Sequence, residues 1–381
     1  MKKNIILLIL FALSVVVKAN DGSYYTSGNQ LIPLKESSIS VSKEILTISI
    51  GDNRYATVDV YYEFINPDKD RTILMGFEAD RPLYDVKYSF EKSHPFIYDF
   101  KVEMNGKPIE YKNYITIPNT AYEPVDFNKW DLNFEAGENY LSLKSNPDSL
   151  ADISYVYSFN APFIPGKNIV HHIYRYKLGK SVEDLFDLEY KLTPATRWAN
   201  HQIDDFTLRI NVDNTAKNFI VRDSAFMGVP FKVIKGIGKM RTGIQDKVYE
   251  GHTDDHYTEF TLRDGMIEWH CTNFKPKNEI VLFSADVLYR CNFEEPVKTG
   301  YFYDRTAYIE DLYPSNFRDL TPRDKRILRN LPYAHRGYVF KDKELQKFFD
   351  RQWWYMPDEN WKLSTRDFTK DERELLKLVV K

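Results

Sequence analysis

Few residues in this chain have the types and spacing that chemistry requires, and the clearest group contains two histidines. His252 and His256 are four residues apart, with Asp254 and Asp255 between them. On a helix, two histidines at this spacing would share one face and could bind zinc. The segment leads into a predicted strand, however, where the same spacing separates them by about 13 Å. It is therefore interpreted as a solvated polar turn, and no metal site is predicted.

Two further patterns also give no catalytic site. His171 and His172 are adjacent, so on a strand their side chains point to opposite faces and cannot bind one ion together. The Gly-rich segment Lys235–Lys239 is similar to a phosphate-binding loop but lacks the Walker spacing and the following Ser or Thr. The sequence also contains no nucleophile elbow and no zinc-protease helix. We therefore predict no cofactor and no catalytic residue.

Arg197 and Trp198 are the candidate ligand-binding residues of the first 300 positions. They follow Pro194 in a predicted loop, where an exposed Trp could stack on a sugar ring. A buried Trp that anchors the loop is the alternative. If these residues do belong to a site, the alternative function is an envelope hydrolase acting on glycan or peptide, with its site between the β domains around Arg197, Asp204 or His256.

The first 19 residues have the pattern of a secretory signal peptide. Two lysines precede an apolar run from Ile5 to Val17, and Val17 to Ala19 offers small residues for cleavage. The run is short for a transmembrane helix, and no later stretch approaches ~20 apolar residues. We therefore expect a mature chain that begins near Asn20, lies in the periplasm or outside the cell, and has no transmembrane span.

Charge and composition bound the function and the fold. The 52 basic and 55 acidic residues leave a formal net charge of -3, which argues against a nucleic-acid partner because such a partner requires a concentrated positive field. The chain contains 27 Tyr and 25 Phe, and aromatic residues favour strands. Most of the chain is therefore predicted to be β structure.

The β pattern is clearest at residues 56–64, where apolar and polar residues alternate. A turn at Asn66–Asp68 follows, and Arg71–Glu78 is predicted as the next antiparallel strand. An Asp264–Gly265 turn predicts a hairpin that pairs Phe260 with Trp269. Regularly spaced strands indicate one or two antiparallel β-sandwich domains. Further strands are expected at Leu46–Ile50, Lys101–Met104, Tyr114–Ile117, Tyr140–Leu143, Ile153–Ser158, Phe206–Val212 and Ile280–Tyr289.

Cys271 and Cys291 are the only cysteines in the sequence. An even number in an exported protein favours a disulfide. A tight turn at Lys275–Asn278, however, would place Leu282 opposite Cys271 and leave Cys291 roughly 30 Å further along an extended strand. A disulfide needs a Cα separation below about 7 Å, so it requires a sharp bend after Asp286. Both the bridged and the free states remain open.

The last 60 residues have helical signals. Thr321, Pro322 and Asp324 form the start of a helix, with a cap, a proline in the first turn and an acid three residues after the cap. A second short helix is predicted over Asp342–Asp350, and a third begins at the capping box Thr369–Glu372. The predicted organisation is a signal peptide (1–19), a β-sandwich domain (20–165), a second β-rich domain (166–300), a linker (301–319) and a small all-α domain (320–381).

A specific motif lies inside this helical domain. The sequence NLPYAHRGYVF at Asn330–Phe340 is followed by WWYMP at Trp353–Pro357. The two segments resemble the signature of the YARHG domain of exported bacterial proteins, although His335 and Arg336 stand in reverse order and Pro332 replaces an apolar helix former. The β region, through SGNQL at 27–31 and MGFE at 75–78, also resembles the uncharacterised exported domain that precedes YARHG in some proteins.

The resemblance implies a binding role and no established activity. Gly337 has the position of a residue that ends a helix in a left-handed conformation. The aromatic residues could form the domain's core, because each buried ring covers on the order of 150–250 Å². Alternatively, some of them form a ligand face with Trp for stacking and Arg for a carboxylate or phosphate. The candidate binding residues are Tyr333, His335, Arg336 and Trp354, and the structural motif residues are Gly337, Tyr338, Phe340, Trp353 and Tyr355.

These observations predict an exported non-catalytic protein whose YARHG-like domain contacts a cell-wall or envelope component or another exported protein. The envelope hydrolase introduced above is the enzymatic alternative. In a third interpretation, the β region is an adhesin or assembly subunit that associates through exposed edge strands.

Overall fold

In the computed structural model of this chain, placement is described for residues 27–28, 31–33, 38–51, 55–80, 93–116, 132–133, 142–143, 154–179, 186–226, 228–244, 256–284, 321–362, 364–366, 368, 372–373, 376–377 and 379. The predicted signal peptide, the predicted linker 301–319 and Cys291 lie outside these residues. The signal peptide and the linker therefore stay predictions, and so does the division of the β region at residue 165.

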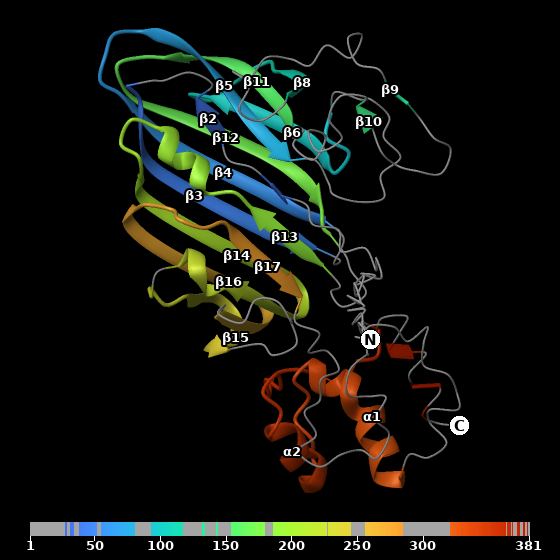
Figure 1. Cartoon of the computed structure of the whole chain (residues 1–381). Helices are drawn as coiled ribbons and strands as arrows, with labels where there is room; N and C mark the ends of the chain where they lie inside the picture. The colour runs from blue at the N-terminus through green and yellow to red at the C-terminus, as the bar shows by residue number, and fades with distance from the viewer. Residues whose placement is uncertain are drawn as a thin grey trace, which may run out of the picture.

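Among the described residues, strands account for the regular structure up to Ser284, apart from two short 3-10 turns, and helices follow from Pro322 (Figure 1). The predicted fold class, a mainly β N-terminal region with a small helical C-terminal domain, is thus confirmed. The strands are β1 (Ser27–Gly28), β2 (Leu31–Pro33), β3 (Ser40–Gly51), β4 (Tyr55–Asn66), β5 (Arg71–Asp80), β6 (Ile97–Met104), β7 (Lys107–Pro108), β8 (Lys112–Thr116), β9 (Leu132–Asn133), β10 (Ser142–Leu143), β11 (Ser154–Phe163), β12 (Gly166–Lys177), β13 (Asp187–Tyr190), β14 (Ile203–Arg222), β15 (Lys232–Ile244), β16 (Tyr257–Phe274) and β17 (Ile280–Ser284). The remaining elements are η3 (Thr193–Arg197), η4 (Asp223–Ala225), α1 (Pro322–His335) and α2 (Lys343–Asp350).

A large sheet of 11 strands forms the body of the β region, in the order β1-β13-β17-β14-β3-β4-β12-β6-β7, with β16 and β15 extending from β14. Most neighbours are antiparallel, but β14 runs parallel to β3, with Ile203 opposite Val41 and Val212 opposite Ile50. Strands from both sides of residue 165 therefore lie in one sheet.

The alternation predicted for β4 is confirmed. Every second residue of this strand is buried, and those between are half-buried, because successive side chains of a strand point to opposite faces. The strand at 71–80 is also present, but its expected pairing with β4 is wrong. After the turn at 66–70, the chain crosses to a second sheet, where Arg71 of β5 stands opposite Phe163 of β11.

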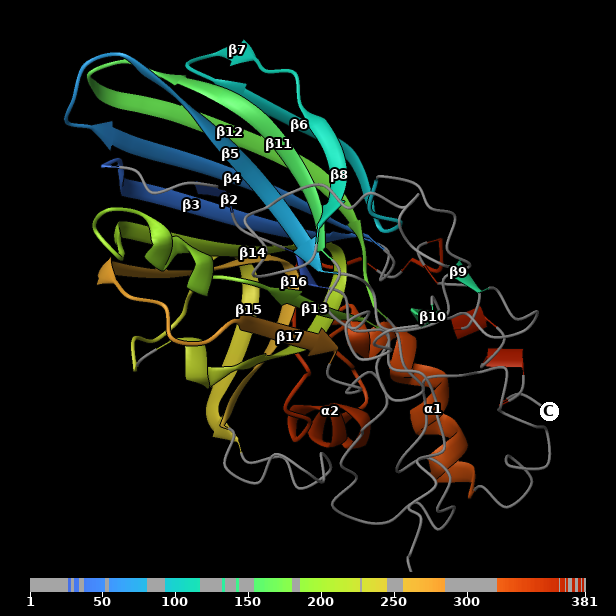
Figure 2. The same cartoon turned by 45° about the horizontal axis from the view of Figure 1, so that its top comes forward.

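The second sheet has the strand order β2-β5-β11-β8 and covers part of the large sheet, as the overlap of β5, β8 and β11 with β4 and β12 shows (Figure 2). Aromatic rings join the two layers. Phe77 of β5 packs 5.1 Å from Phe100 of β6 and 4.9 Å from Tyr174 of β12. Tyr157 of β11 packs 4.9 Å from Phe100. The antiparallel sandwich that the sequence predicted is thus held by an aromatic core.

The hairpin predicted at Asp264–Gly265 is wrong, because β16 continues through these residues as one strand of 18 residues. Phe260 pairs with Phe219 of β14 and with Met240 of β15 instead of with Trp269. Both neighbouring strands change register beside the Asp-Gly pair. At the β15 shift, a Cβ on Gly236 would lie 2.2 Å from the Asp264 carbonyl oxygen. The pair thus marks a bulge, which the same residues favour.

The turn after β16 leads into a strand as predicted, but the two strands are not neighbours. β17 pairs with β13 and with the second half of β14. Leu282 therefore stands opposite Leu188 and Val221 rather than opposite Cys271. The register from which the cysteine separation was estimated is wrong.

Both helices begin as the sequence predicted. Thr321 and Asp324 form a reciprocal capping box at the start of α1, and Asp342 accepts hydrogen bonds from the first turn of α2. In the predicted third helix, the described residues Glu372, Arg373, Leu376, Lys377 and Val379 are helical. No helix of the described residues is long and apolar enough to cross a membrane.

Candidate functional site

The motif residues meet where α1 ends. Gly337 has a φ of 80°, and its N–H donates to Ala334 O (2.8 Å) while Tyr338 N–H donates to Tyr333 O (3.0 Å). This pair of bonds is the Schellman arrangement, which satisfies the last helical carbonyls and needs a residue in the left-handed region. It directs the chain after α1 back across the helix.

Arg336 lies at the same helix end and is bound within the domain. Its NH1 and NH2 atoms lie 2.8 and 2.9 Å from the two carboxylate oxygens of Glu372, and NH1 also donates to Pro332 O at 2.8 Å. The guanidinium stands 4.7 Å from the centre of the Phe368 ring. The side chains of Arg336 and Glu372 are 14% and 11% exposed. The guanidinium that was a candidate to bind a carboxylate or phosphate of a ligand is thus bound to a carboxylate of the chain itself.

His335 and Trp354 also contact each other, with ring centres 4.6 Å apart in an edge-to-face arrangement. His335 Nδ1 lies 4.0 Å from Glu372 Oε1, so the two adjacent motif residues face one carboxylate. Tyr333 packs 4.9 Å from Phe368. The structure therefore brings all four candidate binding residues into one cluster around α1, with Trp354 only 5% exposed.

The other aromatic residues of the motif form the core of the domain, next to this cluster. Phe340 stacks on Phe349 at 4.8 Å, and Tyr338 packs edge-to-face on Phe340 at 5.0 Å. Tyr355 O–H donates to Tyr338 O at 2.7 Å, and the aromatic core raises the pKa of Tyr355 through burial. These contacts match the interpretation of the motif as a packed core.

A junction joins this domain to the β region beside β15 and β16, at the end of the large sheet away from the second sheet (Figure 1). Arg263 of β16 donates from NH1 to Met356 O at 3.0 Å and forms an ion pair with Asp358 at 3.4 Å. Asp358 N–H donates to Gly337 O at 2.8 Å. A Cβ on Gly337 would lie 2.0 Å from Arg263 NH1 and 2.3 Å from Met356 O, so the motif glycine also makes room for the junction.

Trp353 provides the second contact of the junction. Its Nε1–H donates to Glu259 Oε1 of β16 at 3.0 Å, and the guanidinium of Arg241 lies 4.8 Å from the Trp353 ring centre. Lys239 of β15 donates to Tyr355 O at 2.7 Å and to Trp353 O at 3.3 Å. Burial lowers the pKa of Lys239, and the charge of Asp350 opposes that shift. These charged and hydrogen-bonded groups join the domain to the sheet beside an apolar cluster that Tyr257 and Phe283 share with the helices.

An open pocket of about 360 Å³ lies on the exposed side of α2. Sequence reasoning did not single out its basic residues. Lys343 and Lys347 lie in the helix predicted at 342–350, and Arg351 follows four positions later at its C-cap, so the three fall on one face. The residues that line the pocket are Phe340, Lys343, Gln346, Lys347, Asp350 and Arg351.

The candidates in the β region do not all come together in one site. Trp198 is 1% exposed and packs 4.5 Å from Phe64, so it anchors its loop and offers no surface to a ligand. Arg197 is exposed at the end of η3. Asp204 lies at the start of β14, whereas His256 precedes Tyr257, which pairs with the last residue of that strand. At about 3.3 Å per residue, the two ends are tens of ångströms apart, so Asp204 and His256 do not share a site.

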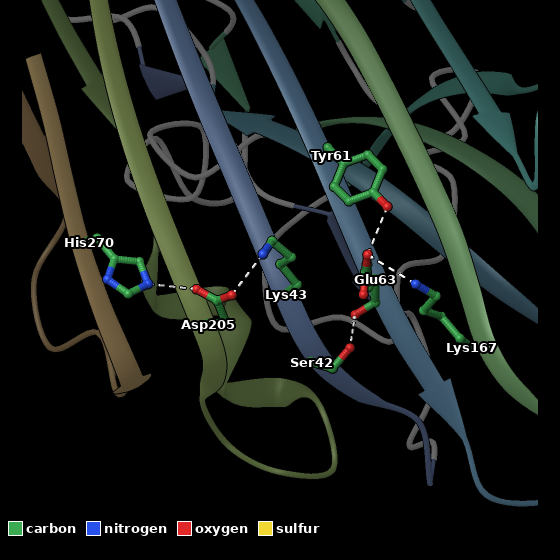
Figure 3. Close-up of polar contacts among 7 residues, drawn as sticks. All are labelled: Ser42, Lys43, Tyr61, Glu63, Lys167, Asp205 and His270. Atoms are coloured by element: carbon green, nitrogen blue, oxygen red, sulfur yellow. Dashed lines mark hydrogen bonds and ion pairs between the residues drawn. The ribbon is translucent and has the colours of Figure 1, made fainter. Parts of the chain in front are cut away.

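Polar contacts cross the outer face of the large sheet (Figure 3). Asp205 of β14 lies between Lys43 Nζ of β3 and His270 Nε2 of β16, each at 2.8 Å, and these two partners hold its pKa below the usual value. Next to them, Glu63 of β4 accepts from Tyr61 O–H at 2.9 Å and pairs with Lys167 at 3.3 Å. Asp205 and Glu63 each face a basic side chain on a neighbouring strand, an arrangement that stabilises sheets.

His171 and His172 occupy opposite faces of β12, as the sequence predicted. His171 is half-exposed and lies between Asp59 (3.0 Å) and Glu103 (3.3 Å), whereas His172 is fully buried. No group of three or more potential metal ligands occurs within the described ranges. Burial raises the pKa of the half-exposed Cys271. Because Cys291 lies outside those ranges, the disulfide stays a prediction.

Known proteins resemble this chain in its C-terminal domain and in its overall fold. Residues 301–381 match the YARHG domain family. A candidate nutrient-binding protein from Legionella pneumophila has a similar structure, with a TM-score of 0.55 and 18% sequence identity over 94% of this chain and 99% of that chain. An M1 zinc metallopeptidase from Deinococcus radiodurans also aligns, with a TM-score of 0.25 and 9% identity over 66% of this chain and 43% of that chain. No curated protein sequence matches this chain.

Proposed function

We propose, from the YARHG domain that the chain carries at residues 301–381, that it is an exported, non-catalytic binding protein. The domain contacts a component of the cell envelope, and the β region holds it in place. Export is supported by the signal-peptide pattern of residues 1–19 and by the occurrence of this domain in exported proteins. The candidate nutrient-binding protein with the similar fold is in keeping with a binding role, and it leaves the ligand open.

The observation that carries the proposal is the internal pairing of the motif. The guanidinium of Arg336 donates its hydrogen bonds to Glu372 and to Pro332 O, and His335 packs on Trp354. A catalytic group must come within hydrogen-bond distance of a substrate atom, and these side chains are held inside the domain. The motif residues thus stabilise the domain and attach it to the sheet. The domain's outer surface is then the part that can contact an envelope component. The proposed role is therefore binding through that surface.

Co-sedimentation of the purified mature chain with cell-wall sacculi, and separately with outer-membrane vesicles, tests this function. We expect the protein to pellet with one of the two and to stay in the supernatant without them. A protein that remains soluble with both would contradict envelope binding and leave another exported protein as the partner to seek.

The same samples test the hydrolase alternative. Labelled sacculi and a labelled peptide mixture should release no soluble fragments above a buffer control, because Asp204 and His256 stand at opposite ends of β14. Fragment release that is lost in an Asp204→Asn variant would instead favour an enzyme and overturn the proposal.

A further inference from the structure

The pocket on α2 has a distinct chemical character. Lys343, Lys347 and Arg351 line it, and all three are exposed. Since an α-helix rises 1.5 Å per residue, cations four positions apart are spaced by about 6 Å along the axis. They form a row of positive charge on one side of the helix, within a chain whose formal net charge is -3. The row is therefore a local feature and does not follow from a generally basic protein.

These three cations are available to a ligand. Across the part of the chain that the structure describes, no ion pair involves Lys343, Lys347 or Arg351, whereas nearby Arg326 is paired with Asp342 and Glu344. Unpaired positive groups at close spacing repel one another, and an anion between them relieves that repulsion. A ligand with several negative charges matches the row better than one with a single charge.

The other lining groups are held in place. Gln346 Oε1 accepts from Phe340 N–H at 2.6 Å, and Gln346 Nε2 donates to Asp350 Oδ1 at 2.7 Å. This pairing fixes Asp350 at the edge of the pocket and leaves its second oxygen to accept a hydrogen bond, for which a hydroxyl is the natural donor. Phe340 is 6% exposed and forms a small apolar floor. The pocket thus offers cations together with one hydroxyl acceptor.

We propose that this pocket binds a carboxylated polysaccharide, whose carboxylates pair with Lys343, Lys347 and Arg351 and whose hydroxyl donates to Asp350. The proposal rests on the proposed function and gives its ligand class. An acyl chain would find little apolar surface, because Phe340 is almost covered and stable lipid binding requires buried apolar area. A single carboxylate beside three cations excludes cationic ligands.

Calorimetric titration of the full mature chain with polygalacturonate tests the proposal, with uncharged dextran as the matched polymer. We expect binding to polygalacturonate alone, weakening as salt is raised because exposed charges are screened over about 8 Å at physiological ionic strength. Lys347→Glu, at the centre of the row, should weaken binding about tenfold. Lys343→Gln combined with Lys347→Gln should weaken it without reversing any charge. The control is Lys362→Glu, an equal charge change at an exposed position outside the pocket.

The outcomes separate the pocket from the wider function. Equal affinity in wild type and Lys347→Glu, or equal weakening by Lys362→Glu, would overturn the pocket. Tighter binding to polyglutamate or to phosphatidylglycerol vesicles than to polygalacturonate would replace the glycan with an acidic peptide or a lipid. If Lys347→Glu still pellets with sacculi, the envelope function survives without this pocket. If polygalacturonate binds through Lys347 while nothing pellets, the pocket survives and the envelope function fails.

Discussion

The two regions of the molecule each enclose a basic side chain, and they accommodate it in opposite ways. In the β sandwich, His172 is 0% exposed and its burial lowers its pKa to about 3, so the ring is neutral. In the YARHG domain, Arg336 keeps its charge and forms two hydrogen bonds with Glu372. The imidazole can lose its proton, whereas a guanidinium does not deprotonate in proteins.

The depth of each core explains the difference. His172 lies between two layers, with Phe77, Phe100 and Tyr174 rings centred 5.5 to 6.0 Å away. Charging a group in such surroundings is costly. The YARHG domain is smaller, and Arg336 reaches its surface with 14% of its side chain exposed. A small domain has too little apolar surface to be stable through burial alone. The sandwich thus relies on apolar burial, whereas the helical domain adds specific polar partners to its aromatic core.

The strongest test of this comparison removes the polar partner. Arg336→Met should destabilise the YARHG domain by about 4 kcal/mol, because removing one member of a largely buried pair leaves Glu372 charged and unpaired. The sandwich should unfold unchanged. Urea-dependent hydrogen exchange, read at the amides of α1 and α2 for the domain and at those of β4 and β12 for the sandwich, measures both regions in one sample.

The double variant Arg336→Met with Glu372→Gln is the control for this prediction. It removes both charges, so most of the lost stability should return. If the single and the double variant lose the same amount, the apolar stem of Arg336 over Phe368 matters more than its charge, and the polar half of the comparison is wrong.

The next largest effect concerns the junction between the regions. Gly337→Ala should destabilise the YARHG domain by about 3 kcal/mol, since it combines left-handed strain of about 1–2 kcal/mol with overlap between the new Cβ and the Met356 carbonyl. Thermal unfolding of the full chain measures the loss. Gly166→Ala is the matched control, because Gly166 has a φ of 81° and open space around it. Equal losses in the two variants would leave no role for the Arg263 contact.

Local signals predicted the elements more reliably than their partners. The alternation at 56–64 predicted β4 and the cap at Asp342 predicted α2, because each of these signals depends only on neighbouring residues. The Asp264–Gly265 hairpin failed because both strands beside β16 shift register there, a property of distant segments. The same reason hid the partner of Arg336, which lies 36 residues later at Glu372.

The candidate site shows the same limit. The YARHG motif located the right domain, but its four candidate binding residues turned out to form one internal cluster, which only the tertiary contacts of Trp354 and Glu372 could reveal. The Lys343, Lys347 and Arg351 row was visible as a helical spacing in the sequence. The aromatic motif beside it is rarer, and a basic helical face is so common on protein surfaces that spacing alone does not separate it from an ordinary solvated face.

The third test addresses the apolar half of the comparison through pH. His172 has a pKa of about 3 in the fold against 6.5 ordinarily, so the unfolded chain takes up the proton first as pH falls. The stability contribution is complete above pH 6.5 and decreases as pH falls toward 3. At pH 5 the loss from this residue should be about 2 kcal/mol.

His172→Leu should remove that component and leave stability at pH 7.5 nearly unchanged, because the ring has no hydrogen-bond partner among the described residues. Urea unfolding at pH 7.5 and pH 5 measures the difference for each protein, which cancels the other titrating groups. His256→Gln, at an exposed position, is the control. If the wild type and the His172→Leu variant lost the same unfolding free energy between pH 7.5 and pH 5, protonation of His172 would carry no stability cost in the folded state.

The smallest expected effect concerns the second contact of the junction between the two regions. Trp353→Phe keeps the ring over Arg241 but removes the N–H that donates to Glu259, and loss of one such bond should cost about 1 kcal/mol. Because Arg241 still pairs with Oε2 of Glu259, the carboxylate keeps one partner, and the loss should appear as local opening of the junction. Hydrogen exchange of β15 amides should accelerate in Trp353→Phe and remain unchanged in Trp361→Phe, whose ring packs on Tyr338 inside the domain. Unchanged exchange in both would mean that the N–H of Trp353 is not needed to hold the two regions together, so that Lys239, Arg263 and the apolar contacts of Tyr257 and Phe283 carry the junction.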